Sequence, residues 1–478
     1  MADLLDLLNT LHPLYAAEKP RWERYRAFGE GIDTSEEKEP WLPKGIYESA
    51  EAYKVRLRLT QDLGQSPSAL LRVKGALFRG EVTRDYSGTQ NPDAFAKFDA
   101  QAGGVRVTVE NLLEQSFEEA AKMGLSLVFV GRHATENPQS AAEEALPFCE
   151  LYQREEAVDW DADAITGTLN WIILKRTVSR RGDALTPRAD ETTWLVCDRQ
   201  STRRFVAASA TSDPQLQSED VHALGIVPVA LHYGIRLGVM DGRSYIDALS
   251  RADLRRLGLE SGNAHSAHLH GSPRMVVKSR KAWDQIPAST SRVLVLDADE
   301  KEDAKYLELD ASGMEVVEKM IESGDRQGAK LAGMDPGTYG GDGTGPAARS
   351  GAAMQWAFAA SEGPTLENLY EGLVRADIEI HEIVARYFSP NVVKADTAAF
   401  VGVIGRAKHW DFMALGELLD AFVTAKSEVP SPTWRREIAK QIAARAPGNL
   451  PPETLKVVMA ELDAAPFADE PPEPQPIV

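Results

Sequence analysis

The sequence predicts an α+β fold, in which helical segments come before and after an antiparallel sheet. Apolar residues recur at helical spacing in the first 123 residues, and short β-rich runs separated by charged, glycine or proline turns occupy residues 147–235. Helical spacing returns after residue 243. The 478 residues are enough for two to four packed units, at roughly 100 to 200 residues per domain.

The N-terminal region is predicted to be helical. Leucines at mixed three- and four-residue spacing indicate a helix within residues 2–30, and further helices are expected at residues 49–63 and 67–78. An amphipathic helix over residues 105–123 should end at Gly124, because glycine commonly terminates helices. The apolar run LSLVFVG that follows is expected to be a buried strand.

A small β-unit is predicted between two helices in the second half of the chain. Strands with the sequences RMVVKSRKAW, RVLVLDA and KYLELDA separate a helix over residues 243–259 from a helix over residues 313–331. Glycine costs about 1 kcal/mol in a helix interior, so glycines in the second helix predict a close approach of another backbone. Five residues of this helix follow the three- and four-residue spacing of a helix lying along another helix: Met314, Val317, Ile321, Gly324 and Gly328.

The last third of the chain is predicted to contain a loop, a long helix and a helical C-terminal region. Residues 333–351 are rich in glycine and are expected to form a flexible loop. A three- and four-residue repeat from Leu366 to Tyr387 predicts a long helix that ends before Pro390. More helix is expected within residues 396–463, whereas the acidic, proline-rich end FADEPPEPQPIV is expected to be disordered.

The net charge of −19, from 72 acidic and 53 basic residues, bears on any nucleic-acid partner. This sign disfavours a protein that wraps nucleic acid by neutralising its phosphates. An acidic wall would instead repel the phosphate backbone and let DNA slide past, although a need for solubility explains the acidity equally well.

No membrane span or secretion signal is expected. No run approaches the roughly 20 consecutive apolar residues that cross a bilayer, and the opening MADLLDLLNTLHPLY lacks the features of a signal peptide. The sequence therefore predicts a protein of the cytoplasm or of a particle assembled there. With only Cys149 and Cys197 present, a disulfide framework is excluded and a single bridge between them stays open.

The residues predict no catalytic site and no cofactor. The glycine-rich loop is not followed by Gly-Lys-Ser/Thr, and no G-x-S-x-G elbow occurs. Two carboxylate pairs beside strands are interpreted as solvated turn residues: Asp161 with Asp163, and Asp297 with Asp299. Three histidines in NAHSAHLHG are candidate metal ligands, but without a carboxylate or an HExxH order they are interpreted as polar residues at a helix end: His265, His268 and His270.

One basic patch stands on the first strand of the small β-unit. Lysines and arginines there are explained either by the protection of an exposed sheet edge or by contact with phosphate or an acidic partner. The patch consists of Arg274, Lys278, Arg280 and Lys281.

The order of these elements resembles that of portal proteins, the head-tail connectors of tailed bacteriophages. Short motifs spread over about residues 20–390 are similar to those of one uncharacterised portal-like phage family. In the N-terminal region they are Trp22-x-Arg24-Tyr25-Arg26-x-Phe28-Gly29, Trp41-Leu42-Pro43-Lys44, Glu51-x-Tyr53-x-x-Arg56-Leu57 and Gly75-x-x-Phe78-Arg79. Further along they are Tyr152-x-x-x-Glu156-x-x-x-Trp160, Leu224-Gly225-x-x-Pro228-Val229 and Gly271-Ser272-Pro273.

The resemblance implies a portal-type fold with a helical stem, a small β clip, an α/β wing and a helical crown. The implied segments are a wing at 1–242, stem helices at 243–271 and 312–332, a clip at 272–311, a tunnel loop at 333–353, a long helix with the wing return at 354–410, a crown at 411–463 and a disordered tail at 464–478.

The resemblance also implies a mechanical function without enzymatic activity. Twelve copies would form a ring at one vertex of the virion capsid, assembled in the host cytoplasm, through which double-stranded DNA passes during packaging and ejection without sequence recognition. Terminase, head-tail adaptor and capsid proteins would dock on it, and no membrane would be involved. The five spaced residues of the second stem helix would pack the stem, the basic patch would serve docking, and three tunnel-loop residues would face DNA: Tyr339, Asp342 and Arg349.

Two other functions stay open at this point. One is a different virion or scaffold-type interaction protein, which would form no ring with a central pore. The other is a metal-dependent hydrolase that uses His265, His268 and His270 with Asp297 or Asp299, which would require stoichiometric bound metal.

Overall fold

A computed structural model gives the structure of the chain and confirms the α+β class, with helices on both sides of an antiparallel β region along the sequence. The chain divides into two compact units, one formed by residues 1–349 with 357–408 and the other by residues 350–356 with 409–478. The residues described here are 4–46, 48–62, 64–79, 82–89, 91–104, 107–132, 146–163, 165–181, 187–222, 224–270, 274–278, 303–307, 312–331, 363–388, 403–406 and 460.

The N-terminal helix predicted within residues 2–30 is divided in two. Helix α1 (Leu4–Leu8) ends before Pro13, which occupies the first position of α2 (Pro13–Glu30). Proline suits a helix start because the first backbone N–H groups of a helix have no partner within it. His12 caps α2, since its Nδ1 accepts a hydrogen bond from the Leu14 N–H at 3.2 Å.

The next helices are short and follow the predicted pattern, with three exceptions. The helices expected at 49–63 and 67–78 are present as α4 and α5, and the expected end of α7 at Gly124 is confirmed by a left-handed glycine with φ +88°. The helices α3 and α6 and the strand β1 were not predicted. The full set is α3 (Ser35–Lys38), α4 (Ala50–Leu59), α5 (Ser66–Leu77), β1 (Val82–Asp85), α6 (Pro92–Gln101) and α7 (Val109–Met123).

Two antiparallel sheets pack against each other and hold the main core. The three-stranded sheet has the order β3 (Pro147–Tyr152), β2 (Leu125–Arg132), β9 (Val229–Tyr233). The five-stranded sheet is a meander of β4 (Ala157–Ala162), β5 (Leu169–Arg180), β6 (Ala189–Asp198), β7 (Ser201–Ala207) and β8 (Gln215–Val221). Buried side chains from both sheets form one cluster, which includes Leu127, Tyr152, Trp160, Ile172 and Leu195.

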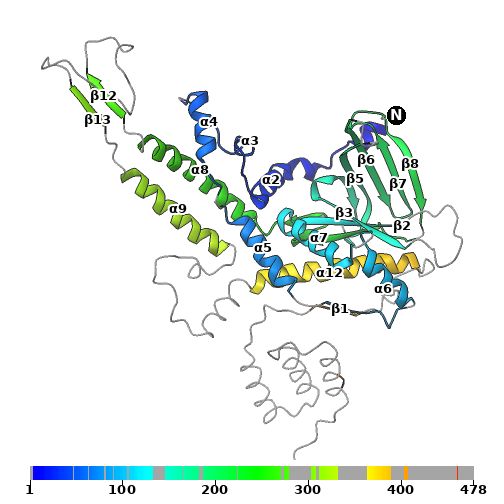
Figure 1. Cartoon of the computed structure of the whole chain (residues 1–478). Coiled ribbons are helices and arrows are strands. Elements are labelled where there is room, and N and C mark those ends of the chain that lie inside the picture. Colours follow the sequence, from blue (N-terminus) through cyan, green and yellow to red (C-terminus); the bar gives the residue numbers. More distant parts are fainter. Residues whose placement is uncertain are drawn as a thin grey trace, which may run out of the picture. The chain divides into compact units, whose positions relative to one another are not determined.

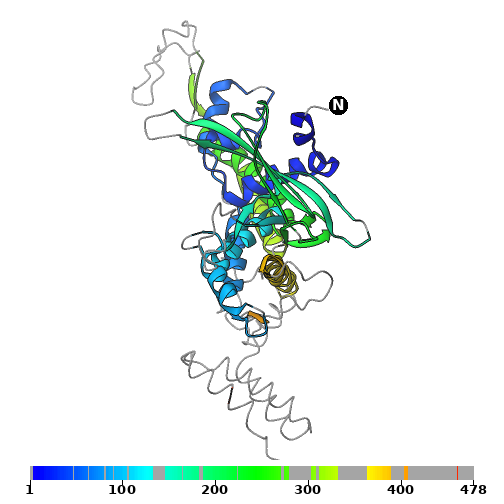
Figure 2. The same cartoon turned by 90° about the vertical axis from the view of Figure 1, so that its right-hand side faces the viewer.

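Helices cover the other face of the three-stranded sheet. Helix α7 packs on β2, and α12 (Gly363–Phe388) packs on β9 and runs beneath both in Figure 1. On the outer face of the five-stranded sheet lies α1, dark blue in Figure 2, whose Leu8 is buried against Ile173 and Trp194. The long helix predicted from Leu366 to Tyr387 is thus confirmed, and its role is to close the helical layer.

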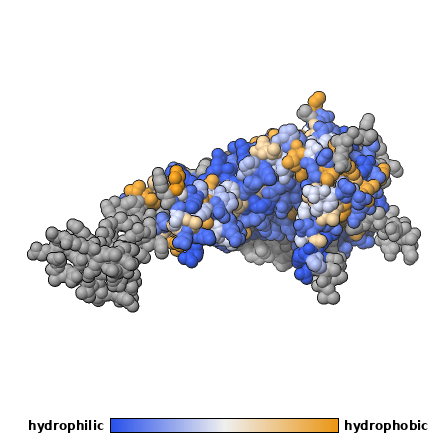
Figure 3. All heavy atoms as spheres, turned by 90° about the horizontal axis from the view of Figure 1, so that it is seen from above, coloured by the Kyte–Doolittle hydropathy of each residue, from blue (hydrophilic) through white to orange (hydrophobic). Residues whose placement is uncertain are grey.

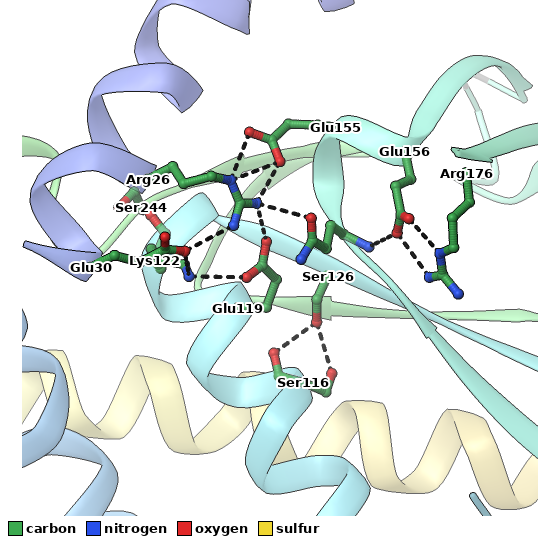
Figure 4. Close-up of polar contacts among 11 residues, drawn as sticks. Arg26, Glu30, Ser116, Glu119, Lys122, Ser126, Glu155, Glu156, Arg176 and Ser244 are labelled. Atoms are coloured by element: carbon green, nitrogen blue, oxygen red, sulfur yellow. Dashed lines mark hydrogen bonds and ion pairs between the residues drawn. The ribbon is translucent and has the colours of Figure 1, made fainter. Parts of the chain in front are cut away.

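A chain of ion pairs fixes α2 to α7 and to the short turn of helix at Arg154–Glu156 (Figure 4). Arg26 of α2 contacts Glu119 of α7 at 2.8 Å and also pairs with Glu155. Lys122, one turn further along α7, contacts Glu30 of α2 at 2.7 Å. Glu119 and Lys122 are each about 8% exposed, so the α7 side of both pairs is shielded from solvent, whereas Glu30 on α2 is 53% exposed. Together the pairs fix the angle between the two helices.

Several predictions concern residues outside the described ranges. They include the middle strand RVLVLDA, the glycine-rich loop, the crown and the acidic tail.

Cys149 and Cys197 are both free and buried, so the single bridge that the sequence left open is not formed. No helix in the described part of the chain is long and apolar enough to span a bilayer, and hydrophilic residues cover most of the face in Figure 3.

Candidate functional site

The candidate site is a pair of antiparallel helices with a β-hairpin at its end (Figure 1). Several residues of these helices have no packing partner among the described residues. Helix α8 (Asp247–His270) leads into β12 (Arg274–Lys278), and β13 (Asp303–Leu307) leads into α9 (Ser312–Leu331), which packs back along α8. The predicted order of helix, small β-unit and helix is therefore confirmed. The two stem boundaries, 243–271 and 312–332, differ from α8 and α9 by a few residues.

The root of α8 is anchored firmly in the body of the chain. The Ser244 Oγ donates to the Lys122 carbonyl at 2.6 Å and accepts from the Ile246 N–H at 3.1 Å. At the first helical residue, Asp247 accepts hydrogen bonds from the Tyr25 hydroxyl at 2.7 Å and from Arg24 at 3.1 Å. These bonds hold α8 at the ends of α7 and α2, so the direction of the helix pair is set by the body.

Two features mark the contact of α9 with the rest of the chain: an ion pair to α8 and the buried Gly328. Arg256 of α8 and Asp325 of α9 form an ion pair at 2.7 Å. Gly328 of α9 is buried, and a Cβ added there would lie 2.8 Å from the Gln65 Oε1 and 3.9 Å from Leu249. The nearest neighbours of such a Cβ are thus side chains of α8 and of the residue before α5, and no backbone of another segment lies as close in the described part of the chain.

Among the residues that the structure describes, Gly324 has no close neighbour within its own chain, so its predicted packing against another helix stays a prediction about contact between copies. A Cβ added at Gly324 would meet nothing within 4 Å in the described part of the chain outside its own helix backbone. The same holds for Gly258 and Gly262 of α8, which sequence reasoning did not single out although their four-residue spacing was a signal. Three glycines therefore sit in helix interiors, at about 1 kcal/mol each, with no contact among the described residues that requires them.

Apolar side chains on α9 are also left uncovered. Val316 is 58% exposed and Met320 is 41% exposed, one turn apart on the helix. A groove of about 400 Å³ runs between α8 and α9 beside them, and its lining includes Ala252, Leu259 and Gly324. Of the other predicted packing residues, Val317 and Ile321 are half-buried, and Met314 is described in its backbone only.

The exposed charges of the two helices differ. On α8, Arg251 and Arg255 are exposed one turn apart and stand in line with Gly258 and Gly262. On α9, helical spacing places the exposed Glu315, Glu318 and Glu322 on the side away from Gly324, with the exposed Lys319 and Arg326 among them. Together the open glycines and the exposed apolar pair give this helix pair the character of an unoccupied interface.

The hairpin beyond the helices carries part of the predicted basic patch. Strands β12 and β13 pair antiparallel with Arg274 opposite Leu307 and Lys278 opposite Asp303. Arg280, Lys281 and the three tunnel-loop residues Tyr339, Asp342 and Arg349 lie outside the described residues. The structure thus places two of the four patch residues at opposite ends of one strand.

The described residues contain no group of three histidine, cysteine or acidic side chains arranged to hold a metal ion. His265 is half-buried on α8, the side chains of His268 and His270 are not described, and Asp297 and Asp299 lie outside the described ranges. The turn interpretation fits Asp163, whose carboxylate accepts from the Ile165 N–H at 2.7 Å and from the Thr166 N–H at 3.2 Å. Asp161 accepts from the Asn170 side chain at 2.7 Å.

No protein-family model matches the chain, and no curated protein matches it. Among solved structures, a chain from the neck of an empty GTA particle, computed with C6 symmetry, is 12% identical with a TM-score of 0.38, over 88% of this chain and 96% of that one. A chain from the virion of a native gene transfer agent (GTA) particle is 12% identical with a TM-score of 0.34, over 78% and 96%. A chain from the neck of a native GTA particle, computed with C12 symmetry, is 10% identical with a TM-score of 0.36, over 87% and 95%. At these identities and TM-scores, the similarities assign no family to the chain.

Proposed function

We propose that this chain is the portal subunit of a phage-like particle, a ring at one capsid vertex that conducts double-stranded DNA during packaging and ejection. The observation that carries the proposal is the uncovered face of the α8–α9 pair. Its open glycines and its exposed Val316 and Met320 fit contact with an identical helix pair of the next copy. Such a contact joins two different surfaces of the same chain, and contacts of this kind close into rings when the rotation between copies allows it.

The position of the hairpin and the charge of the chain support the same function. The β12–β13 hairpin lies at the end of the helix pair, away from the root of α8, where terminase and head-tail adaptor proteins could reach it. The net charge of −19 suits a channel that repels phosphate and lets the duplex pass without binding. Under this proposal the chain works in the virion as a ring, a dodecamer, without enzymatic activity, and occupies the neck region that the similar GTA structures are named for.

A negative-stain image of the purified protein tests the proposal most directly. Rings with a central hole are expected. A compact particle without a pore, both in solution and in virions, would contradict the portal function and favour another virion or scaffold-type protein. Bound metal in stoichiometric amount, measured by elemental analysis, would favour a hydrolase instead.

Gly324→Leu is expected to prevent ring formation while leaving the monomer folded. The new side chain has open space in its own chain beside the α8–α9 groove, so the free energy of unfolding should change by less than about 1 kcal/mol. It would, however, fill the space that a neighbouring helix needs. Native mass spectrometry measures the ring, and urea unfolding measures the monomer.

Gly328→Leu is the matched control, because Gly328 is buried and a leucine there must displace the end of the Gln65 side chain and press against Leu249 of the same chain. This variant should destabilise the monomer by about 1–3 kcal/mol. Dodecamers of normal size formed by Gly324→Leu would refute the role of this face.

Charge reversal of Arg274, Lys278, Arg280 and Lys281 is expected to abolish docking of terminase or adaptor while rings still form. The reason is that close opposite charges contribute strongly to specific docking and to the rate of encounter. An in vitro packaging assay measures the effect. Reversal of the exposed Lys54 and Arg58 on α4 serves as control and should leave packaging intact; unchanged packaging by the hairpin variant would rule out its docking role.

A further inference from the structure

We propose that the five-stranded sheet continues from one copy of the chain into the next, by pairing of β8 with the far half of β5 in the neighbouring copy. This inference rests on the proposed ring, and it names a second contact between copies that is separate from the α8–α9 pair. Both strand segments lie at edges of the same sheet, and in the described part of the chain no strand pairs with the outer side of either one.

Strand β8 forms the first open edge. It pairs with β7 on one side, and in the described residues no strand pairs with its other side (Figure 1). Six of its seven residues are exposed, including Leu216 at 53% and Val221 at 76%. An edge of this kind presents a row of unpaired backbone N–H and C=O groups that can pair with a strand from another molecule.

The far half of β5 forms the second open edge. Strand β4 covers β5 only from Leu169 to Leu174, whereas β5 continues to Arg180 beside β6. Arg176 still forms ion pairs within its own chain, with Glu150 at 2.7 Å and Glu156 at 2.5 Å. From Thr177 to Arg180 every residue is exposed, so the open part of this edge begins at Thr177.

The two edges carry opposite charges. Glu219 and Asp220 stand on β8, whereas Arg180 and Arg181 stand at the end of β5. Pairing one edge with the other brings opposite charges together, which stabilises cross-strand neighbours. Pairing of β8 with β8, or of β5 with β5, would bring like charges together and is disfavoured.

The arrangement selects a second copy of this chain as the partner. The complementary edges lie on opposite sides of one sheet. The same contact between β8 and β5 can therefore repeat from each copy to the next, head to tail, around a ring. The existing partners of the edge charges are exposed and weakly held. Arg203 and Glu219 are 43% and 40% exposed, and Arg180 and Glu191 are 65% and 37% exposed, so both pairs can exchange partners at little cost.

Cysteine cross-linking of assembled rings tests the pairing. Val178→Cys on β5 is combined in turn with Ser218→Cys, Asp220→Cys or Val221→Cys on β8, because placing Arg180 opposite Glu219 brings Val178 to this part of β8, and facing residues of adjacent strands are close enough for a disulfide. Within one copy these positions are three strands apart, roughly 14 Å, and cannot join. Cys149 and Cys197 are buried and should therefore form no cross-links.

After mild oxidation, at least one combination is expected to give a ladder of covalent dimers, trimers and larger species on a denaturing gel, and the single-cysteine variants should give no such ladder. Rings that form normally without a ladder in any combination would overturn this inference and leave the portal function intact. Absence of rings in the unmodified protein would instead remove the proposed function.

Charge exchange gives a second readout. Glu219→Lys with Asp220→Lys should lower the cross-linked fraction about fivefold at low salt, and adding Arg180→Glu with Arg181→Glu should restore it. Glu36→Lys with Glu39→Lys, at exposed positions near α3, makes the same change in net charge and should have no effect. Failure of the second pair of substitutions to restore cross-linking would refute the charge pairing.

Discussion

Gly124→Ala is expected to lower the free energy of unfolding by more than about 4 kcal/mol, a loss seen only for severe substitutions. Gly124 has a φ of +88°, which side chains of L-residues adopt at a cost of about 1–2 kcal/mol. A Cβ at this position would also lie 2.3 Å from the carbonyl oxygen of Gly242, a backbone atom that cannot move aside independently. Urea unfolding followed by tryptophan fluorescence measures the loss.

Gly225→Ala separates the two causes. Gly225 also has a positive φ, +70°, but a Cβ there would meet nothing within 4 Å in the described part of the chain. It should therefore cost only the conformational part, about 1–2 kcal/mol. We call the close approach of the Gly124 and Gly242 backbones the crossing. If both variants lost the same free energy of unfolding, the crossing would contribute nothing to the loss.

The crossing matters because it sets the start of α8. Gly124 ends α7, its carbonyl accepts from the Gly234 N–H at 2.9 Å, and the Tyr245 N–H bonds to the Ala121 carbonyl at 2.9 Å. A side chain at the crossing would push these segments apart. The helix pair would then lose its fixed direction, so any Gly124→Ala protein that folds should form rings poorly.

Gly124 also shows what the sequence could and could not predict. Its place at the end of an amphipathic helix was readable from local pattern, as were α12, the helices flanking the hairpin and the β region. The crossing with Gly242 depends on segments 118 residues apart, which no local pattern encodes. Strand β1 was missed for a related reason: it is four residues long, and its partner β14 (Val403–Arg406) comes from the far end of the chain.

The candidate site was predictable in outline and not in detail. The three- and four-residue spacing predicted that α9 lies along another helix, and it packs along α8, because packing along a helix follows from sequence period. Gly324 stands in the same series, yet it faces open space, since the period cannot tell contact within a chain from contact between chains. Only the positions of the atoms around each glycine distinguish a contact within the chain from a contact between chains.

Asp377→Ala is expected to cost about 3–5 kcal/mol, because it removes the fully buried carboxylate that Arg84 and His381 share. Asp377 of α12 is fully buried; its Oδ2 accepts from Arg84 of β1 at 2.8 Å, and its Oδ1 lies 3.1 Å from the Nδ1 of His381. Arg406 of β14 is bound through Glu110 at 2.7 and 2.8 Å beside the same group. The network thus holds the β1–β14 pair against α12.

Both nitrogens of His381 face acceptors, which makes this residue the pH-sensitive member of the network. Nδ1 donates to the Asp377 carbonyl at 2.8 Å, and Nε2 lies 3.0 Å from the Tyr86 hydroxyl and 3.3 Å from Asp99. The Tyr86 hydroxyl donates to Asp99 at 2.5 Å, so its oxygen is left to accept from Nε2. Burial lowers the pKa of His381, but the hydrogen bonds to Asp377 and Asp99 outweigh it and raise the pKa to about 9.

The pH dependence of unfolding separates this ion network from ordinary packing. A histidine whose pKa is raised on folding stabilises the fold fully below its unfolded pKa of 6.5 and loses that contribution as the pH rises through 9. Wild type should therefore show a falling urea midpoint between pH 6.5 and 9.5, and His381→Gln should lose most of that slope. Glu18→Ala, which removes the exposed pair with Arg21, should change stability by less than about 1 kcal/mol at any of these pH values. If His381→Gln kept the full slope, the proton would have to be bound elsewhere, and the buried cluster would hold α12 to β14 by shape and hydrogen bonding alone.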